Sequence, residues 1–221
     1  KKGVHVQPEW AFTFAGIRSL CVSLQKDISS QKYKAFPHMF ELMALEYSRI
    51  HLGPHAKAIH TGWPREPGQP TKFRELAKFI NESTAEWFWG PDDGLEDEDS
   101  NKIKDGGVDF ITWLSFPEGF PGQLFITGQC ACGNDWKNKP HEANPKNYKK
   151  WFNPISWIEP IQAFCTPFAL VEAYIKEMSD VAGLIYERTR FSGLAKSYEH
   201  ELPENVKNGM RECIKIFLGE T

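Results

Sequence analysis

Apolar residues recur at helical spacing in several stretches of the chain. Between residues 37 and 51, one stripe is formed by Phe40, Met43, Ala44, Tyr47 and Ile50. Recurrence at i, i+3, i+4 and i+7 predicts an amphipathic helix. The same spacing predicts helices near residues 8–29, 71–87, 167–181 and 203–218. Ser192 is a candidate N-cap for one more helix.

Short apolar runs between these helices indicate strands. They lie at residues 58–60, 108–113, 123–131, 157–165 and 184–186. Strands that alternate with helices are typical of an α/β fold whose sheet is covered on both faces. We therefore expect a central mixed sheet of about five strands flanked by helices. One domain is expected over residues 1–221, with residues 1–35 as an N-terminal helical appendage.

The runs at 108–113 and 123–131 form a predicted β-hairpin that turns at residues 118–120. Antiparallel pairing around that turn sets Asp109 across from Gln129 or Cys130. Directly opposed Cβ atoms lie about 4.5 to 5.5 Å apart, so side chains on one face can share a hard cation. The alternative is an ordinary hairpin in which Asp109 caps a turn after two glycines.

Length and composition favour a folded protein. The chain has 221 residues, of which 41% are hydrophobic, and this is enough to bury a full core. No run approaches the roughly 18 apolar residues of a membrane span. The first residues, from Lys1 to His5, also lack the apolar core of a signal peptide. We expect a soluble cytoplasmic protein without a membrane partner.

We expect the five cysteines to be buried free thiols, because their number is odd and most of them lie in apolar runs. An alternative is a zinc site, although no paired Cys-x-x-Cys knuckles accompany the four residues that would form it, Cys130, Cys132, His141 and Cys165. The closest group of histidines is His51, His55 and His60, and surface or loop positions suit them better than a metal site.

A net charge of −3 argues against binding of nucleic acid by bulk charge, so local patches must supply any such contact. One patch contains Lys137, Lys139, Lys146, Lys149 and Lys150, interleaved with aromatic residues. These lysines can contact DNA phosphates while the aromatic rings stack on bases, or the segment can be a solvated surface. Arg188 and Arg190, after the last short strand, either clamp phosphate or pair with surface acids.

Three features together resemble the PD-(D/E)XK restriction-endonuclease-like superfamily. They are an acid on an early helix, the strand start Gly106-Gly107-Val108-Asp109, and the stretch from Leu124 to Trp136. That stretch is similar to a glutamine-containing second motif found in some bacterial restriction and antiphage defence proteins. The resemblance covers residues 37–190. It implies a restriction-endonuclease-like fold and DNA cleavage that depends on Mg²⁺ or Mn²⁺.

Carried over to this chain, the resemblance implies that Asp109, Gln129 and Glu41 bind the metal, with Glu46 as the fallback acid on the helix. The position where the family has its lysine is occupied by Ala131. The catalytic cation must then come from Lys137 or Lys139. A neutral glutamine oxygen weakens a Mg²⁺ site that holds one or two carboxylates, but does not abolish it.

Two functions follow from these observations. The first is a Mg²⁺-dependent endonuclease, a hydrolase that cuts DNA in a bacterial restriction or antiviral defence system. Such an enzyme could act as a homodimer. The second is a catalytically inactive nuclease-fold module that binds DNA or docks onto other subunits of a defence complex. The strand start that ends in Asp109 favours the first function, and Ala131 favours the second.

Overall fold

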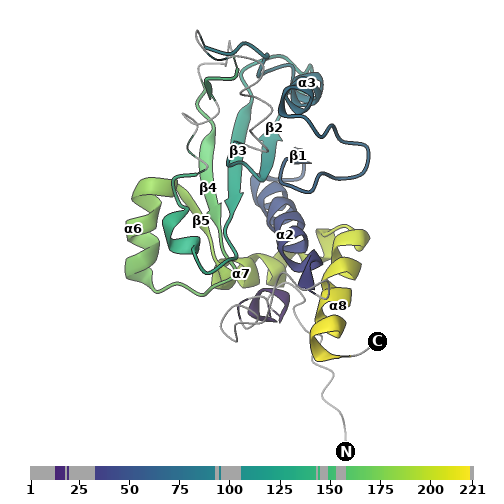
Figure 1. Cartoon of the computed structure of the whole chain (residues 1–221), viewed down its shortest axis with the longest axis vertical. Helices are drawn as coiled ribbons and strands as arrows, with labels where there is room; N and C mark the ends of the chain where they lie inside the picture. Colours follow the sequence, from purple (N-terminus) through teal and green to yellow (C-terminus); the bar gives the residue numbers. More distant parts are fainter. Residues whose placement is uncertain are drawn as a thin grey trace, which may run out of the picture.

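A five-stranded mixed sheet forms the centre of the molecule (Figure 1). The computed structural model describes residues 13–17, 19, 33–92, 95, 106–142, 144, 149–152 and 158–219. The strands follow one another across the sheet in the order β1-β2-β3-β4-β5. The first three are antiparallel neighbours, whereas β4 and β5 run parallel to β3. The expected α/β class with a mixed, helix-flanked sheet is therefore confirmed.

The hairpin has the register that its turn residues predict. The strands are β1 (Ala56–His60), β2 (Phe110–Leu114), β3 (Leu124–Cys130), β4 (Ile161–Cys165) and β5 (Leu184–Tyr186). Phe110 of β2 pairs with Gly128 of β3. The next residue on each side of this pair is Asp109 and Gln129, respectively. The register therefore carries these two candidate ligands to the same end of the hairpin.

Five helices of the described ranges flank the sheet, and three of them cover one of its faces. The helices are α2 (Ala35–Leu52), α3 (Phe73–Thr84), α6 (Glu172–Ala182), α7 (Arg188–Tyr198) and α8 (Glu204–Leu218), with 3-10 turns η2 (Trp136–Asn138) and η3 (Glu199–Glu201). Helix α2 crosses β1, β2 and β3, and both α7 and α8 pack against it. Its apolar stripe, which includes Phe40, Met43 and Tyr47, is fully buried, as the helical spacing predicts.

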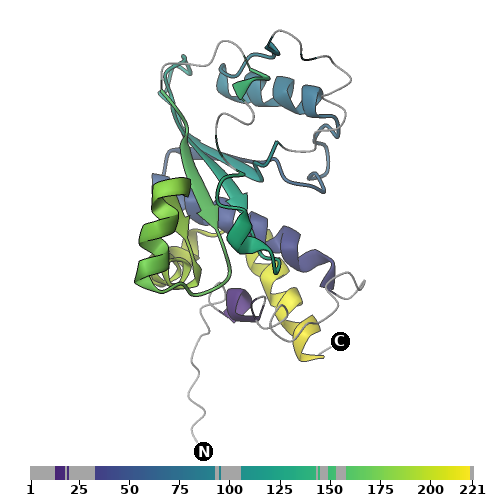
Figure 2. The ribbon, with the colours of Figure 1, turned by 60° about the vertical axis from the view of Figure 1, so that its left-hand side comes forward.

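The opposite face is covered in two parts. Helix α3 packs on the hairpin side against Ile111, Trp113 and Phe125. Helix α6 covers β4 and β5, where it buries Phe164 and Ile185. Figure 2 shows α3 at the upper end of the molecule, and α2, α7 and α8 together at the lower end. Both faces are thus covered, which the alternation of strands and helices predicts.

The prediction that Ser192 caps a helix is wrong. Helix α7 begins at Arg188, directly after β5, so Ser192 lies inside it. The buried Glu187 side chain is the cap, because it accepts hydrogen bonds from the amides of Thr189 and Arg190. A carboxylate that accepts two amide protons satisfies donors that a helix start leaves unpaired.

Part of the predicted N-terminal appendage packs into the main core. Residues 13–17 are helical. The ring centroid of Phe14 lies 6.0 Å from that of Phe36 on α2, and Ile17 is buried in the same cluster. Residues 1–12, 18 and 20–32 of that appendage lie outside the described residues. Among the helices of the described ranges, none is long and apolar enough to cross a bilayer.

Candidate metal centre

Asp109 is held at the start of β2 by backbone hydrogen bonds. Its carbonyl oxygen accepts from the amides of Thr61 and Gly62, both at 2.8 Å, and its amide donates to the Gly128 carbonyl at 2.8 Å. The side chain is buried, and its Oδ2 accepts a hydrogen bond of 2.6 Å from the Cys130 amide. The carboxylate is thus tied to the neighbouring strand, which favours a shared site at this end of the hairpin.

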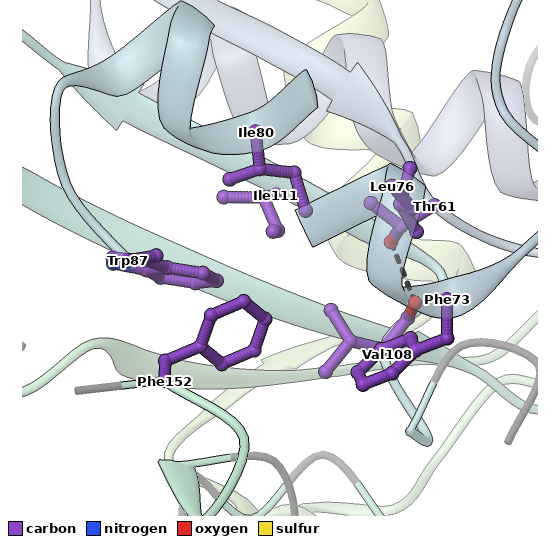
Figure 3. A pocket seen from close by; sticks show the side chains of 8 residues that line it. All are labelled: Thr61, Phe73, Leu76, Ile80, Trp87, Val108, Ile111 and Phe152. Atoms are coloured by element: carbon purple, nitrogen blue, oxygen red, sulfur yellow. Dashed lines mark hydrogen bonds between the residues drawn. The ribbon is translucent and has the colours of Figure 1, made fainter. Parts of the chain in front are cut away.

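A packed apolar layer fixes this end of the hairpin (Figure 3). Side chains of α3 face Val108 and Ile111, and Trp87 and Phe152 close the layer. The Thr61 hydroxyl donates to the Val108 carbonyl at 2.6 Å, drawn as the dashed line in Figure 3. The space left between these side chains is about 10 Å³. It is too small and apolar to hold a polar ligand, so the layer positions Asp109 and is not itself a binding site.

Glu41 of α2 approaches Asp109 through the space beside Gly62. A Cβ atom at Gly62 would lie 2.6 Å from Glu41 Oε2, 3.2 Å from Asp109 Oδ1 and 3.0 Å from His60 Nε2. The shortest of these distances is below van der Waals contact, so the lack of a side chain at Gly62 keeps the space open. Two carboxylate oxygens and one imidazole nitrogen therefore surround a common point.

Gln129 presents an oxygen at the same end of the hairpin. Its side-chain amide nitrogen donates to Glu142 Oε2 at 3.1 Å. Its Oε1 atom is buried and has no hydrogen-bond partner within the described part of the chain. Buried polar atoms without a partner are uncommon, because burial removes the water that would otherwise bind them. A cation bound by Asp109 would satisfy this oxygen.

These side chains line one open cavity of about 440 Å³. The lining includes the three predicted metal ligands, Glu41, Asp109 and Gln129, which the fold therefore brings together. Asp135 and Glu142 also line it, so the lining has four acidic side chains and one lysine. Such an excess of negative charge attracts a divalent cation and disfavours an anion unless a cation is bound.

A scan of protein-family models and searches of the curated proteins and of the solved structures found no match to this chain. The functional interpretation therefore rests on the cavity and its donor atoms. A larger cavity of about 680 Å³ lies beside Leu114, Phe116 and Leu124, at the other end of the hairpin. None of the described residues that line it is acidic. The carboxylate cavity is thus the better candidate for metal chemistry.

The two candidate lysines lie in different surroundings. Lys139 lines the carboxylate cavity, and its Nζ is 3.6 Å from Asp135 Oδ2 and 3.9 Å from Glu142 Oε2. Lys137 instead places its Nζ 5.5 Å from the ring centroid of Tyr174, which is a cation–π contact. Lys139 is therefore the lysine that stands next to the predicted metal ligands.

Ala131, at the family's lysine position, is a core residue. It is buried in the cluster that contains Phe164 and Met178, beneath α6. It also borders the carboxylate cavity, where it contributes no charge. The short turn η2 follows the hairpin, and Lys139, directly after it, reaches the cavity.

The described residues that were predicted to contact DNA do not line the carboxylate cavity. Lys149 pairs with Glu159, and Arg190 Nη1 donates to the Ile185 carbonyl at 2.7 Å. Lys146 lies outside the described residues. The other four are described, and none of them is among the residues that line the cavity: Lys149, Lys150, Arg188 and Arg190. Their contact with DNA stays a prediction.

The fallback acid Glu46 does not enter the cavity lining, since its Oε2 accepts a hydrogen bond of 2.7 Å from Arg49 Nε.

The described cysteines are buried core residues. Burial raises the pKa of the Cys130 thiol well above its usual range, and a hydrogen bond with Cys165 acts in the same direction. A raised pKa keeps the thiol protonated, which disfavours metal binding by Cys130.

Two histidines beside the cavity differ from the sequence-based expectation. His38 is not among the predicted ligands, and the expected surface or loop position of His60 is wrong, because His60 is buried at the end of β1. Within the described residues, the group of three potential ligands whose atoms all lie within 4.8 Å of one another is His38, Glu41 and His60. The alternative zinc set of three cysteines and His141 does not gather in this way. One sequence signal existed, because His38 precedes Glu41 by one helical turn and so shares its face of α2.

Proposed function

We propose that this chain is a DNA endonuclease that depends on Mg²⁺ or Mn²⁺, with Glu41, Asp109 and Gln129 as metal ligands and Lys139 as the catalytic cation. The observation that carries this proposal is the convergence of two carboxylates from distant elements. Glu41 Oε2 and Asp109 Oδ1 lie 2.6 and 3.2 Å from the same point beside Gly62. Oxygen donors of this kind are the ligands that Mg²⁺ prefers.

The donor atoms fit a hard cation. Asp109 accepts a hydrogen bond from the Cys130 amide through Oδ2, and its Oδ1 lies 3.2 Å from the common point. Gln129 adds a neutral oxygen, oriented by the hydrogen bond from its amide nitrogen to Glu142. The metal, when bound, supplies the positive charge that neutralises the phosphate during cleavage.

Lys139 is suited to act on the phosphate or on the attacking water. Its Nζ is held near Asp135 and Glu142, at 3.6 and 3.9 Å, so it remains at the cavity without a close hydrogen bond to either acid. An ammonium group in this position can stabilise negative charge that develops on the phosphate oxygens. The assignment to a bacterial restriction or antiphage system rests on the resemblance of the two hairpin motifs.

The second candidate is a catalytically inactive module of the same fold that binds DNA or docks onto other subunits. It is favoured by Ala131, which leaves the position two residues after Gln129 without a cationic side chain. If Lys139 is only an ion-pair partner of the cavity acids, the metal ligands have no catalytic cation beside them.

Nicking of supercoiled plasmid DNA separates the two candidates. The wild-type protein is expected to nick DNA in Mg²⁺ or Mn²⁺ and to stop when EDTA is added. Asp109→Asn keeps the size of the side chain but removes its charge, and we expect the rate to fall by at least about 10²-fold. The matched control is Asp180→Asn, an exposed acid on α6, which should cut like wild type.

Equal rates for wild type and Asp109→Asn would refute the assignment of Asp109 as a metal ligand. If the folded wild-type protein retards DNA in a gel but never nicks it with either metal, the endonuclease proposal fails and the inactive module is supported.

A further inference from the structure

A second donor set lies immediately beside the proposed Mg²⁺ site. His60, at the end of β1, is almost fully buried, and its Nε2 lies 2.8 Å from Glu41 Oε2. His38, one turn before Glu41 on α2, places its Nδ1 3.9 Å from the same oxygen. The ligand atoms of the three side chains all lie within 4.8 Å of one another. Atoms bound to one transition metal at about 2.0 to 2.2 Å each have separations of this order.

The imidazole of His38 is held in the orientation that metal-binding histidines adopt. Its Nε2 is 2.7 Å from Oε1 of Glu66, in the loop that follows β1. Its Nδ1 is buried and, within the described part of the chain, has no hydrogen-bond partner. Metal-bound histidines usually donate their second ring N–H to a carboxylate, which sets the tautomer and leaves the other nitrogen for the ion. In this arrangement Glu66 is the carboxylate that accepts the N–H of His38, and Nδ1 of His38 is the nitrogen left for an ion.

The space between the donors is kept open by Gly62. A Cβ atom there would come within 2.6 Å of Glu41 Oε2 and 3.0 Å of His60 Nε2. The rings of His38 and His60 stand nearly perpendicular, with an interplanar angle of 84° and centroids 5.0 Å apart. Two imidazoles at this angle direct their nitrogens toward Glu41 without stacking on one another.

We propose that His38, Glu41 and His60 bind a first-row transition-metal ion of the Zn²⁺ class, in a site that shares Glu41 with the proposed Mg²⁺ site. Two imidazole nitrogens and one carboxylate form a donor set that suits Zn²⁺ or Co²⁺ and is poorly matched to Mg²⁺, which prefers oxygen. This binding needs no DNA and no cutting, so it does not rest on the proposed nuclease activity. Because one carboxylate serves both sites, occupancy by Zn²⁺ withdraws a ligand from Mg²⁺.

Titration with Co²⁺ tests the site directly. Protein freed of metal by a chelator and then dialysed is expected to bind one equivalent of Co²⁺. The visible absorption should have the intensity of a four- or five-coordinate site, and it should be lost when Zn²⁺ is added. We expect His38→Ala and His60→Ala each to weaken Co²⁺ binding by at least about 100-fold. The matched control, His55→Ala, removes an exposed histidine five residues before His60 and should bind like wild type.

Two further variants separate metal binding from a general loss of fold. Glu66→Gln keeps the hydrogen bond to His38 but removes the charge, and should weaken binding by about 10-fold to 100-fold. Gly62→Ala fills the space without removing a ligand and should weaken binding by at least about 10-fold. Its control is Gly193→Ala on α7, where an added Cβ meets nothing within 4 Å. Circular dichroism of each variant shows whether it is folded.

The proposal is overturned if wild-type protein shows no intense Co²⁺ absorption, or if the folded His38→Ala variant binds Co²⁺ as wild type does. Should His60→Ala fail to fold, His38→Ala and Gly62→Ala still decide the question. Asp109→Asn distinguishes this site from the nuclease, because it should keep Co²⁺ binding while losing Mg²⁺-dependent nicking. Nicking without Co²⁺ binding overturns only the transition-metal site, and Co²⁺ binding without nicking overturns only the nuclease.

Discussion

Replacing Gln129 by glutamate would test whether this side chain belongs to a metal site. In the present structure the Gln129 amide nitrogen donates to Glu142 Oε2 at 3.1 Å. Gln129→Glu removes this donor and sets two carboxylates against each other. At 3.1 Å and an effective dielectric constant of about 20, their repulsion is about 5 kcal/mol. The Glu142 side chain is 41% exposed, so solvent screening lowers the net cost to about 1 to 3 kcal/mol.

The assay is equilibrium unfolding in urea, followed by tryptophan fluorescence at neutral pH. In EDTA, Gln129→Glu should lower the free energy of unfolding by about 1 to 3 kcal/mol. In millimolar Mg²⁺ most of that loss should be recovered, because a cation between the carboxylates replaces repulsion with attraction.

The control is the exchanged pair, Gln129→Glu combined with Glu142→Gln. It restores one amide and one carboxylate with their roles reversed, so its stability in EDTA should return toward that of wild type. If Gln129→Glu is as stable as wild type in EDTA, the contact between these side chains is refuted. An equal loss in EDTA and in Mg²⁺ would refute a cation bound next to position 129.

Two other substitutions probe the cavity and its support. Lys139→Ala should lower the nicking rate by about 10²-fold or more, whereas Lys137→Ala, which loses only its contact with aromatic rings, should change it less than about threefold. Comparable losses for both lysines would contradict the assignment of Lys139 as the catalytic cation. Glu187→Ala should lower the free energy of unfolding by about 1 to 3 kcal/mol, because it leaves the amides of Thr189 and Arg190 without their acceptor. An effect no larger than that of Glu177→Ala, an exposed site on α6, would show that this cap contributes little.

The hairpin was predictable because its geometry is local. The turn residues determine the register, and the register carries Asp109 and Gln129 to one end of the two strands. The helical spacing around Phe40 and Tyr47 similarly predicts α2 and its buried face. The prediction of Ser192 as an N-cap was wrong because α7 begins directly after β5. There the buried carboxylate of Glu187 caps the helix, and the Ser192 hydroxyl lies further along the chain, inside α7.

The rest of the site depends on contacts between segments distant in sequence. The run at residues 58–60 predicts a strand that ends at His60, but nothing local indicates that this end lies beside the first turns of α2, or that Gly62 faces two carboxylates. The angle at which α2 crosses the sheet decides that Glu41 enters the cavity while Glu46 pairs with Arg49. Such angles follow from packing of the whole core, which spacing along one segment does not encode.

The pairing of β1 with β2 has a consequence for when the site appears during synthesis. The donors on α2 and β1 precede residue 61, whereas Asp109 and the later cavity residues lie in the hairpin strands or in the segment that follows them. A nascent chain that has emerged only as far as β1 therefore holds an incomplete donor set. Contacts between distant segments also form late in folding, since closing the intervening loop costs entropy. The proposed metal site is therefore complete only after the strands that carry its later donors have formed.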